Sequence, residues 1–217
     1  SYSDNKGVTG LYGKVDDGGY EEIPGVITEG GTTVTKDYAC VEGTHTYTFK
    51  AVDAAGNVTV TDALTVKLDT IKPVMGDAAF NEGYKNLWNW LIRKDSLEIT
   101  IPVAEAGSGI ESVDYELISE DSSTTAGQAS VKKASGENSA GYTAVIYINP
   151  DFKGKIMITA RDHAGNVSDT KMIGTDGSGI HGIIVEDHAP EITFSVNGSE
   201  SPEKEYEKAP TVIVMVG

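Results

Sequence analysis

Residues 47–58 read YTFKAVDAAGNV, and residues 156–167 read IMITARDHAGNV. The first half of each copy shows the period-two pattern of a β-strand that buries one face. The Asp-x-Ala-Gly step that follows fits a type I turn, in which Gly takes the left-handed conformation and closes a hairpin with a bulge. The two copies therefore predict two hairpins with structural turn residues, namely Asp53, Gly56, Asn57, Asp162, Gly165 and Asn166.

The hairpin sets the register of a repeat. Asn57 and Asn166 lie 109 residues apart, and GVTGL from residue 7 matches GIESV from residue 109 with an offset of 102. Each hairpin is followed by a strand pattern and then by an acid and a proline, at 69–73 and 187–190. Proline directly after a strand cannot extend the ladder, which predicts short, stiff junctions. An all-β repeat of this length predicts tandem Ig-like antiparallel β-sandwiches.

This register divides the chain into three segments. Residues 1–69 are predicted to form an Ig-like domain that lacks its first strands, and residues 70–187 a complete Ig-like domain with a tryptophan-containing insertion. Residues 188–217 are predicted to be the opening strands of a third repeat, because their last apolar run matches 97–101. An open sheet edge invites strand addition. We expect either that residues 190–217 complete the first domain of another copy, or that both ends are arbitrary cuts.

Alternating apolar residues predict further strands near 8–15, 20–27, 32–38, 97–103, 113–117 and 142–148. The polar segment 119–127 is expected to be a loop. The segment 81–91 departs from the strand pattern and contains both tryptophans.

Composition and charge argue against nucleic-acid binding, membrane insertion and an intrachain disulfide. The formal net charge is −16, so we expect no nucleic-acid partner, because phosphate recognition needs a basic patch. No run of 18 apolar residues occurs, and we expect no membrane insertion. The single cysteine, Cys40, excludes an intrachain disulfide.

The motif Ala-x-Asp-x-Ala-Gly-Asn, at 51–57 and 160–166, resembles the Ig-like repeats of bacterial cell-surface proteins. Ser-Gly-Ile at 108–110 and Val-x-Tyr at 113–115 are also similar to that family, whereas Lys-Gly-Val at 6–8 departs from it. The resemblance implies an extracellular location, at the cell surface or cell wall, and a structural or adhesive role. A surface polysaccharide or a host protein would be the partner of such a module.

No pattern in the sequence predicts catalysis or a cofactor. The four histidines have no metal-ligand spacing, and no nucleophile elbow, phosphate loop or zinc signature occurs. Calcium is an alternative, because acidic junctions between β-domains are similar to those of cadherins. However, the junction at 69–73 offers one carboxylate and a lysine, whereas calcium takes six to eight oxygens. We therefore expect no enzyme and no metal site.

Three aromatic residues are candidates for ligand binding: Tyr84, Trp88 and Trp90. On a strand, Trp88 and Trp90 would share a face and could stack against sugar rings. The competing interpretation is that one or both fill the sandwich core. Two alternatives to a structural role follow, which are a carbohydrate-binding accessory region of a secreted glycoside hydrolase and a strand-exchanged fibre subunit.

Overall fold

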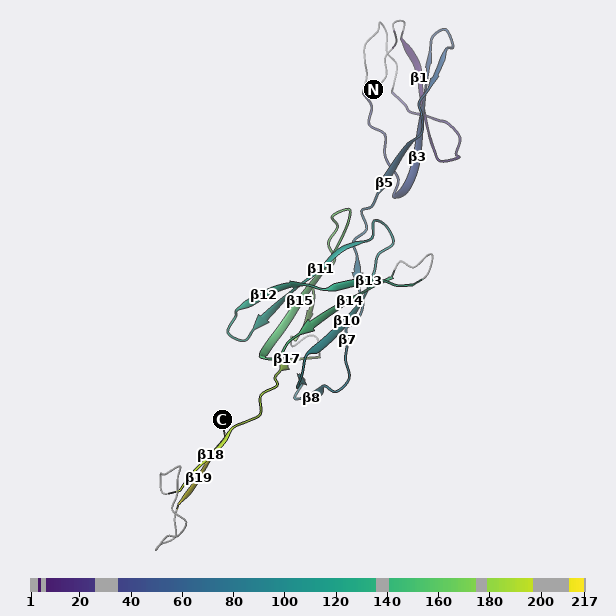
Figure 1. Cartoon of the computed structure of the whole chain (residues 1–217). Helices are drawn as coiled ribbons and strands as arrows, with labels where there is room; N and C mark the ends of the chain where they lie inside the picture. Colours follow the sequence, from purple (N-terminus) through teal and green to yellow (C-terminus); the bar gives the residue numbers. More distant parts are fainter. Residues whose placement is uncertain are drawn as a thin grey trace.

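The computed structural model describes residues 4, 7–25, 35–135, 141–174, 179–196 and 211–216. Every regular element in these ranges is a β-strand, which confirms the all-β class, and none of them holds a helix that could cross a membrane. The strands form an N-terminal sheet (β1–β5), a central sandwich (β6–β17) and a C-terminal hairpin (β18–β19). These three parts follow one another along an elongated chain (Figure 1).

The N-terminal sheet has the strand order β2-β1-β3-β4, and β5 also pairs with β3. Its strands are β1 (Val8–Val15), β2 (Glu21–Glu22), β3 (Gly43–Asp53), β4 (Val58–Val60) and β5 (Leu64–Leu68). The strand predicted at 8–15 is confirmed. Of the strand predicted near 20–27, Glu21 and Glu22 form β2 and residues 26–27 lie outside the described residues. Of the strand predicted near 32–38, residues 35–38 are irregular and the others lie outside the described residues.

The central sandwich consists of two sheets. The first has the order β13-β14-β10-β6, with β7 paired to β10, and comprises β6 (Val74–Met75), β7 (Ala79–Phe80), β10 (Leu97–Ala104), β13 (Ser130–Lys133) and β14 (Gly141–Ile148). The second has the order β12-β11-β15-β17-β9-β8, with β16 paired to β15. It comprises β8 (Lys85–Leu87), β9 (Trp90–Arg93), β11 (Ile110–Ser119), β12 (Thr124–Gln128), β15 (Phe152–Asp162), β16 (Lys171–Ile173) and β17 (Gly182–Val185).

The hydrophobic core lies between these two sheets. Alternate residues of β10, such as Ile99 and Ile101, are fully buried and belong to one cluster with Ile156 and Ile158 of β15. Full burial of such a side chain contributes roughly 1.5–3 kcal/mol. By contrast, the apolar side chains that are buried in the described part of the N-terminal sheet and its loops are Val8, Ile23 and Tyr47. The sandwich is therefore the well-packed part of the chain.

The N-terminal sheet and the sandwich share one irregularity. In the pair β1–β3 a bulge follows Val8, which pairs with Asp53. In the pair β11–β15 a bulge follows Ile110, which pairs with Asp162. The two bulges are separated by the 102 and 109 residues of the sequence repeat. The same local geometry thus recurs in the register that the hairpins predict.

One local expectation is wrong, and two further features of the sandwich have no counterpart in the sequence patterns. The segment 119–127 contains β12, which pairs with β11 as an edge strand and is polar because both of its faces are largely exposed. The hairpin β8–β9 begins within the segment 81–91, at Lys85, and ends at Arg93. Finally, β17 runs parallel to β9, so the sandwich is not wholly antiparallel.

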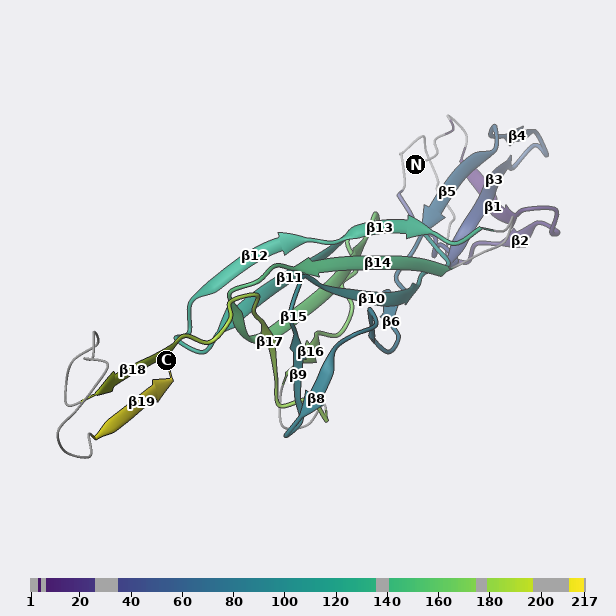
Figure 2. The ribbon, with the colours of Figure 1, turned by 60° about the horizontal axis from the view of Figure 1, so that its bottom comes forward.

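The C-terminal hairpin consists of β18 (Ile192–Val196) and β19 (Val212–Val216), where two opening strands were predicted. Within the described residues these strands pair only with each other. Figure 1 and Figure 2 both show the hairpin separate from the sandwich.

Candidate functional site

The junction between the N-terminal sheet and the sandwich is built around Asp69, the residue that follows β5. Its Oδ2 accepts a hydrogen bond from the backbone N–H of Ser108 at 2.6 Å, and its Oδ1 accepts one from Ile71 at 3.2 Å. The backbone carbonyl of Asp69 accepts from Nδ2 of Asn166 at 3.0 Å. The hydrogen bonds from the Ser108 side chain and backbone lower the pKa of Asp69, so this carboxylate is ionised at neutral pH.

Further contacts fix the junction from both sides. On the N-terminal side, the Glu42 carboxylate accepts hydrogen bonds from the backbone N–H and the hydroxyl of Thr70. On the sandwich side, Lys72 Nζ lies 2.5 Å from the exposed carboxylate of Asp169. The connection from Asp69 to Pro73 therefore makes polar contacts with both parts.

Three carboxylates meet at this junction. Asp69 follows β5, Glu105 follows β10 and Asp162 ends β15, and one carboxylate oxygen from each lies within 4.8 Å of the other two. Glu105 is 5% exposed and Asp162 is fully buried. We call these three residues the junction cluster.

Glu105 is the unusual member of the junction cluster. Its Oε1 accepts a hydrogen bond from the backbone N–H of Gly107 at 2.6 Å, whereas its buried Oε2 has no hydrogen-bond partner in the described part of the chain. Among the ion pairs of the described residues, none involves a member of the cluster. A buried polar atom without a hydrogen-bond partner is costly in free energy.

Sequence reasoning missed Glu105. The expectation of no metal site considered the junction at 69–73 alone, where Asp69 supplies the one carboxylate. The fold adds Glu105 and Asp162, which come from other strands. The available signal was the position of Glu105 just before the Gly-Ser-Gly turn at 107–109. The strand after this turn pairs with the end of β15, next to the hairpin at 162–166.

A second acidic group lies at the next junction. His188 Nδ1 is 3.1 Å from the Asp151 carboxylate and 3.3 Å from that of Asp187. All three side chains are exposed, and the histidine already pairs with both acids. Exposed contacts of this kind contribute little to stability.

The two predicted hairpin turns have the same geometry. In the first, the N–H of Gly56 donates to the Asp53 carbonyl at 3.2 Å, and Gly56 has a φ of +86°. The Asp53 carboxylate accepts from both the backbone and the side chain of Asn57, and these bonds lower the pKa of Asp53. The second turn repeats the same bonds between Asn166 and Asp162 at 2.8 Å.

In addition to the turn contacts that it shares with Asn57, its counterpart in the first turn, Asn166 also binds the junction. Its Nδ2 reaches both the Asp162 carboxylate and the Asp69 carbonyl, so the second turn also holds the junction. Asp162 belongs to the junction cluster, whereas Asp53 does not.

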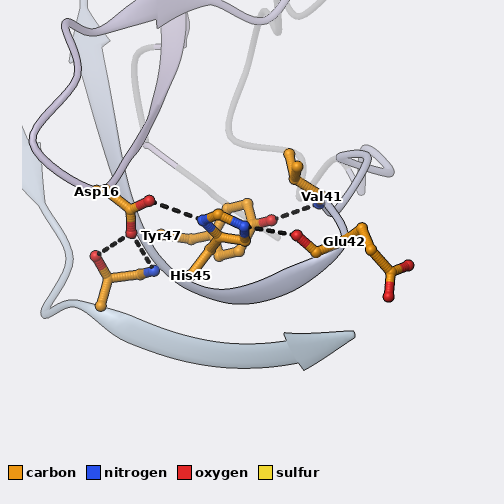
Figure 3. Close-up of polar contacts among 6 residues, drawn as sticks. Asp16, Val41, Glu42, His45 and Tyr47 are labelled. Atoms are coloured by element: carbon orange, nitrogen blue, oxygen red, sulfur yellow. Dashed lines mark hydrogen bonds and ion pairs between the residues drawn. The ribbon is translucent and has the colours of Figure 1, made fainter. Parts of the chain in front are cut away.

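A histidine is held in the N-terminal sheet (Figure 3). His45 lies between two acceptors, because Nδ1 faces Asp16 Oδ2 and Nε2 faces the Glu42 carbonyl. The Asp16 carboxylate also accepts from the N–H and the hydroxyl of Thr46. Nearby, the Tyr47 hydroxyl accepts from the N–H of Val41 at 2.7 Å. These hydrogen bonds fix the backbone at Val41 and Glu42. The Glu42 side chain in turn binds Thr70 at the junction.

The three candidate aromatic residues do not form one flat platform. Trp88 and Asn89 are the two residues of the β8–β9 turn, with φ of +52° and +64°, so Trp88 and Trp90 do not share a strand face. Trp88 is 84% exposed, and Tyr84 is also exposed. Trp90 is half-buried and packs edge-on against His181. Neither tryptophan is among the buried core residues.

One face of the N-terminal sheet is only partly covered by the described residues. A groove of about 620 Å³ lies over it, lined in part by Val8, Leu11, Ile23, Tyr38, Phe49 and Ala51. Phe49 and Ala51 are half-buried, although Ile158 and Ala160, their counterparts at an offset of 109, are fully buried in the sandwich. In the sandwich, the sheet that contains β10 and β14 packs over the corresponding side chains of β15. The groove therefore lies where such a second sheet would pack on the N-terminal sheet.

No protein-family model matches the chain, and the search of curated proteins found no significant match.

Proposed function

We propose that the chain is a non-enzymatic structural or adhesive segment of tandem Ig-like repeats, from a bacterial surface or secreted multidomain protein. The hydrogen-bonded junction carries this proposal. Asp69 is bound to Ser108 and Asn166 of the sandwich, while Thr70 is bound to Glu42 of the N-terminal part. A connection that is fixed on both sides keeps successive domains in line, which is what a spacer needs. The location at the cell surface rests on the resemblance of the Ala-x-Asp-x-Ala-Gly-Asn hairpins.

Small-angle X-ray scattering of the chain tests the spacer role. We expect a rod-like particle with one preferred length, and a broader distribution of lengths when Asp69 and Thr70 are both replaced by glycine. A matched replacement of Asp62 and Thr61, which precede β5 within the N-terminal sheet, should leave the length unchanged. A compact particle, or equal breadth for both variants, would refute the spacer role.

A strand-complemented assembly is the second candidate, in which residues 190–217 of one copy fill the open groove of another. Two observations favour it, the groove over Phe49 and the apolar C-terminal hairpin. Ile192 and Phe194 pair with Val216 and Val214, so these side chains share one face of the hairpin, and all four are about half exposed or more. Val214 corresponds to the buried Ile99 of β10 at an offset of 115. The same strand is therefore core-forming in one repeat and uncovered in the other.

Light scattering coupled to size exclusion tests this assembly. Val214→Asp places a charge on the apolar face and should convert an oligomer into a monomer, because a buried unpaired charge is costly. Met215→Asp is the matched control, since Met215 pairs with Thr193 and points to the opposite face. A wild-type chain that is monomeric at every accessible concentration would exclude this candidate.

A further inference from the structure

We propose that the junction cluster of Asp69, Glu105 and Asp162 binds a hard divalent cation, with calcium as the preferred ion. The site ties the N-terminal sheet to the sandwich, since Asp69 belongs to the connection and the other two ligands belong to β10 and β15. It deepens the proposed spacer function but does not require it, because ion binding is measured without reference to the parent protein.

The first argument is charge. Three carboxylates gather here, one of them fully buried and one 5% exposed, and the described residues supply no ion pair to any of them. Like charges at this separation disfavour one another, and burial strengthens the effect. A divalent cation would remove most of this repulsion, because it offsets two of the three negative charges.

The second argument is the unpartnered oxygen. Glu105 Oε2 is buried without a hydrogen-bond donor, while Oε1 is fixed by the N–H of Gly107. Buried polar atoms in native proteins nearly always have a partner, so an unpaired one calls for a ligand. The Glu105 carboxylate is positioned by its backbone contact, and one of its oxygens lies within 4.8 Å of a carboxylate oxygen of both Asp69 and Asp162. This is the role of a metal ligand.

The third argument concerns the identity of the ion. All three donors are carboxylates, which suit calcium or magnesium rather than the softer transition metals. Calcium accepts carboxylates in irregular geometry with six to eight oxygens, whereas magnesium demands a near-octahedral shell and gives up its water reluctantly. Two further features shape the site. The N–H of Ser108 fixes the Asp69 carboxylate, and a Cβ at Gly107 would lie 2.5 Å from the carboxyl carbon of Asp69.

Calorimetric titration of the chelator-treated chain with calcium chloride is the primary test. We expect one calcium ion to bind per chain, with a dissociation constant of about 0.1–1 mM, which is the range of extracellular calcium-binding modules. The melting temperature of the sandwich should rise by about 5 °C at a saturating concentration of calcium. The backbone amide signals of Gly107 and Ser108 should shift in nuclear magnetic resonance spectra.

Glu105→Gln should change the melting temperature in opposite directions with chelator and with calcium. With chelator, the variant should melt at a higher temperature than the wild type, because an amide can accept from Gly107 and also donate to a neighbouring carboxylate. With calcium, it should melt at a lower temperature, and its affinity should fall at least about tenfold. Glu111→Gln is the matched control, because it removes one exposed acid from β11 and should change neither quantity.

Gly107→Ala tests the geometry without removing a ligand. The added methyl group would collide with the Asp69 carboxylate, so calcium affinity should fall although all three acids remain. The proposal is overturned if the folded wild type gives neither binding heat nor a melting shift with calcium, or if Glu105→Gln binds calcium like the wild type. An equal or larger response to magnesium would overturn the assignment to calcium. Because the elongated shape is measured separately, a rod-like chain that binds no calcium would refute this inference and leave the spacer role intact.

Discussion

His45 and Asp16 form a short contact, with Nδ1 and Oδ2 2.7 Å apart. The other ring nitrogen of His45 faces the Glu42 carbonyl at 2.8 Å. Both ring nitrogens thus face acceptors, which only the doubly protonated imidazolium can satisfy with two N–H groups. The hydrogen bond to Asp16, followed by that to Glu42, raises the pKa of His45 above its ordinary value of 6.5. The two acceptors therefore favour the protonated form of His45 in the folded N-terminal sheet.

This contact predicts that the N-terminal sheet is most stable in mild acid. The pKa of His45 is raised, so its contribution is complete below pH 6.5 and is lost as the pH rises through the higher folded value. The pKa of Asp16 is lowered by Thr46 and His45, so its contribution is present above pH 3.8 and is lost as the pH falls through the lower folded value. Melting curves recorded at a series of pH values below 3.8, between 3.8 and 6.5, and above 6.5 measure both effects.

His45→Gln is the control for this pH dependence. Glutamine can still donate to Asp16 but does not titrate, so the melting temperature of the N-terminal sheet should no longer fall as the pH rises above the free-histidine pKa of about 6.5. An unchanged pH profile in the variant would show that another group is responsible.

The two hairpin asparagines should differ in their effect on stability. Asn166→Ala removes hydrogen bonds to both Asp162 and Asp69, whereas Asn57→Ala removes bonds to Asp53 alone. At about 1 kcal/mol for each net hydrogen bond, we expect losses of about 2 and 1 kcal/mol respectively. Urea unfolding measures them. Tryptophan fluorescence reports the sandwich, because both tryptophans lie there, and circular dichroism follows the whole chain. Equal losses would contradict the junction role of Asn166.

The fully buried Ile158 and its counterpart Phe49 provide a second comparison. Ile158→Ala should cost about 3–4 kcal/mol, because it leaves a cavity in a closed core. Phe49→Ala should cost only about 1–2 kcal/mol, well below the usual value for a buried phenylalanine, because Phe49 lines an open groove. If the groove is filled by another copy, Phe49→Ala should also weaken the oligomer. A large loss in a strictly monomeric chain would mean that the groove is closed in solution.

Trp88 provides the test of carbohydrate binding. Asparagine adopts left-handed conformations more readily than tryptophan, so Trp88→Asn should leave the sandwich folded, with a melting temperature equal to or above that of the wild type. If soluble cell-wall polysaccharides quench the tryptophan fluorescence of the wild type, Trp88→Asn should abolish that change. Trp90→Phe should retain it, because Trp90 packs against His181. Without quenching in the wild type, the accessory-region alternative fails.

Local patterns predicted the parts of the fold that depend on neighbours in the sequence. The strand Val8–Val15 has the predicted bounds, and Gly56 takes the left-handed conformation that its turn requires. Even the repeat register reappears, since Gly7 and Gly109 both have positive φ at an offset of 102. These features follow from alternation and turn chemistry alone.

Contacts between segments that are distant in the sequence could not be predicted from local patterns. The polar strand β12 shows no alternation, because its hydrogen bonds to β11 rather than a buried face hold it in place. The parallel pairing of Ile183 with Leu91 joins segments about 90 residues apart, which no local pattern encodes. The junction cluster is of the same kind, because Glu105 becomes a candidate ligand only when three strand ends meet at Asp69.

The direction of β5 has a mechanical consequence. This strand runs along the long axis of the molecule and leads directly into the junction (Figure 1). Its pairs with β3, from Gly43↔Leu68 to Tyr47↔Leu64, are perpendicular to the strand. Tension applied along the chain therefore loads these hydrogen bonds simultaneously, in shear, instead of opening them one after another. A chain arranged in this way withstands stretching at β5 until the whole ladder breaks at once.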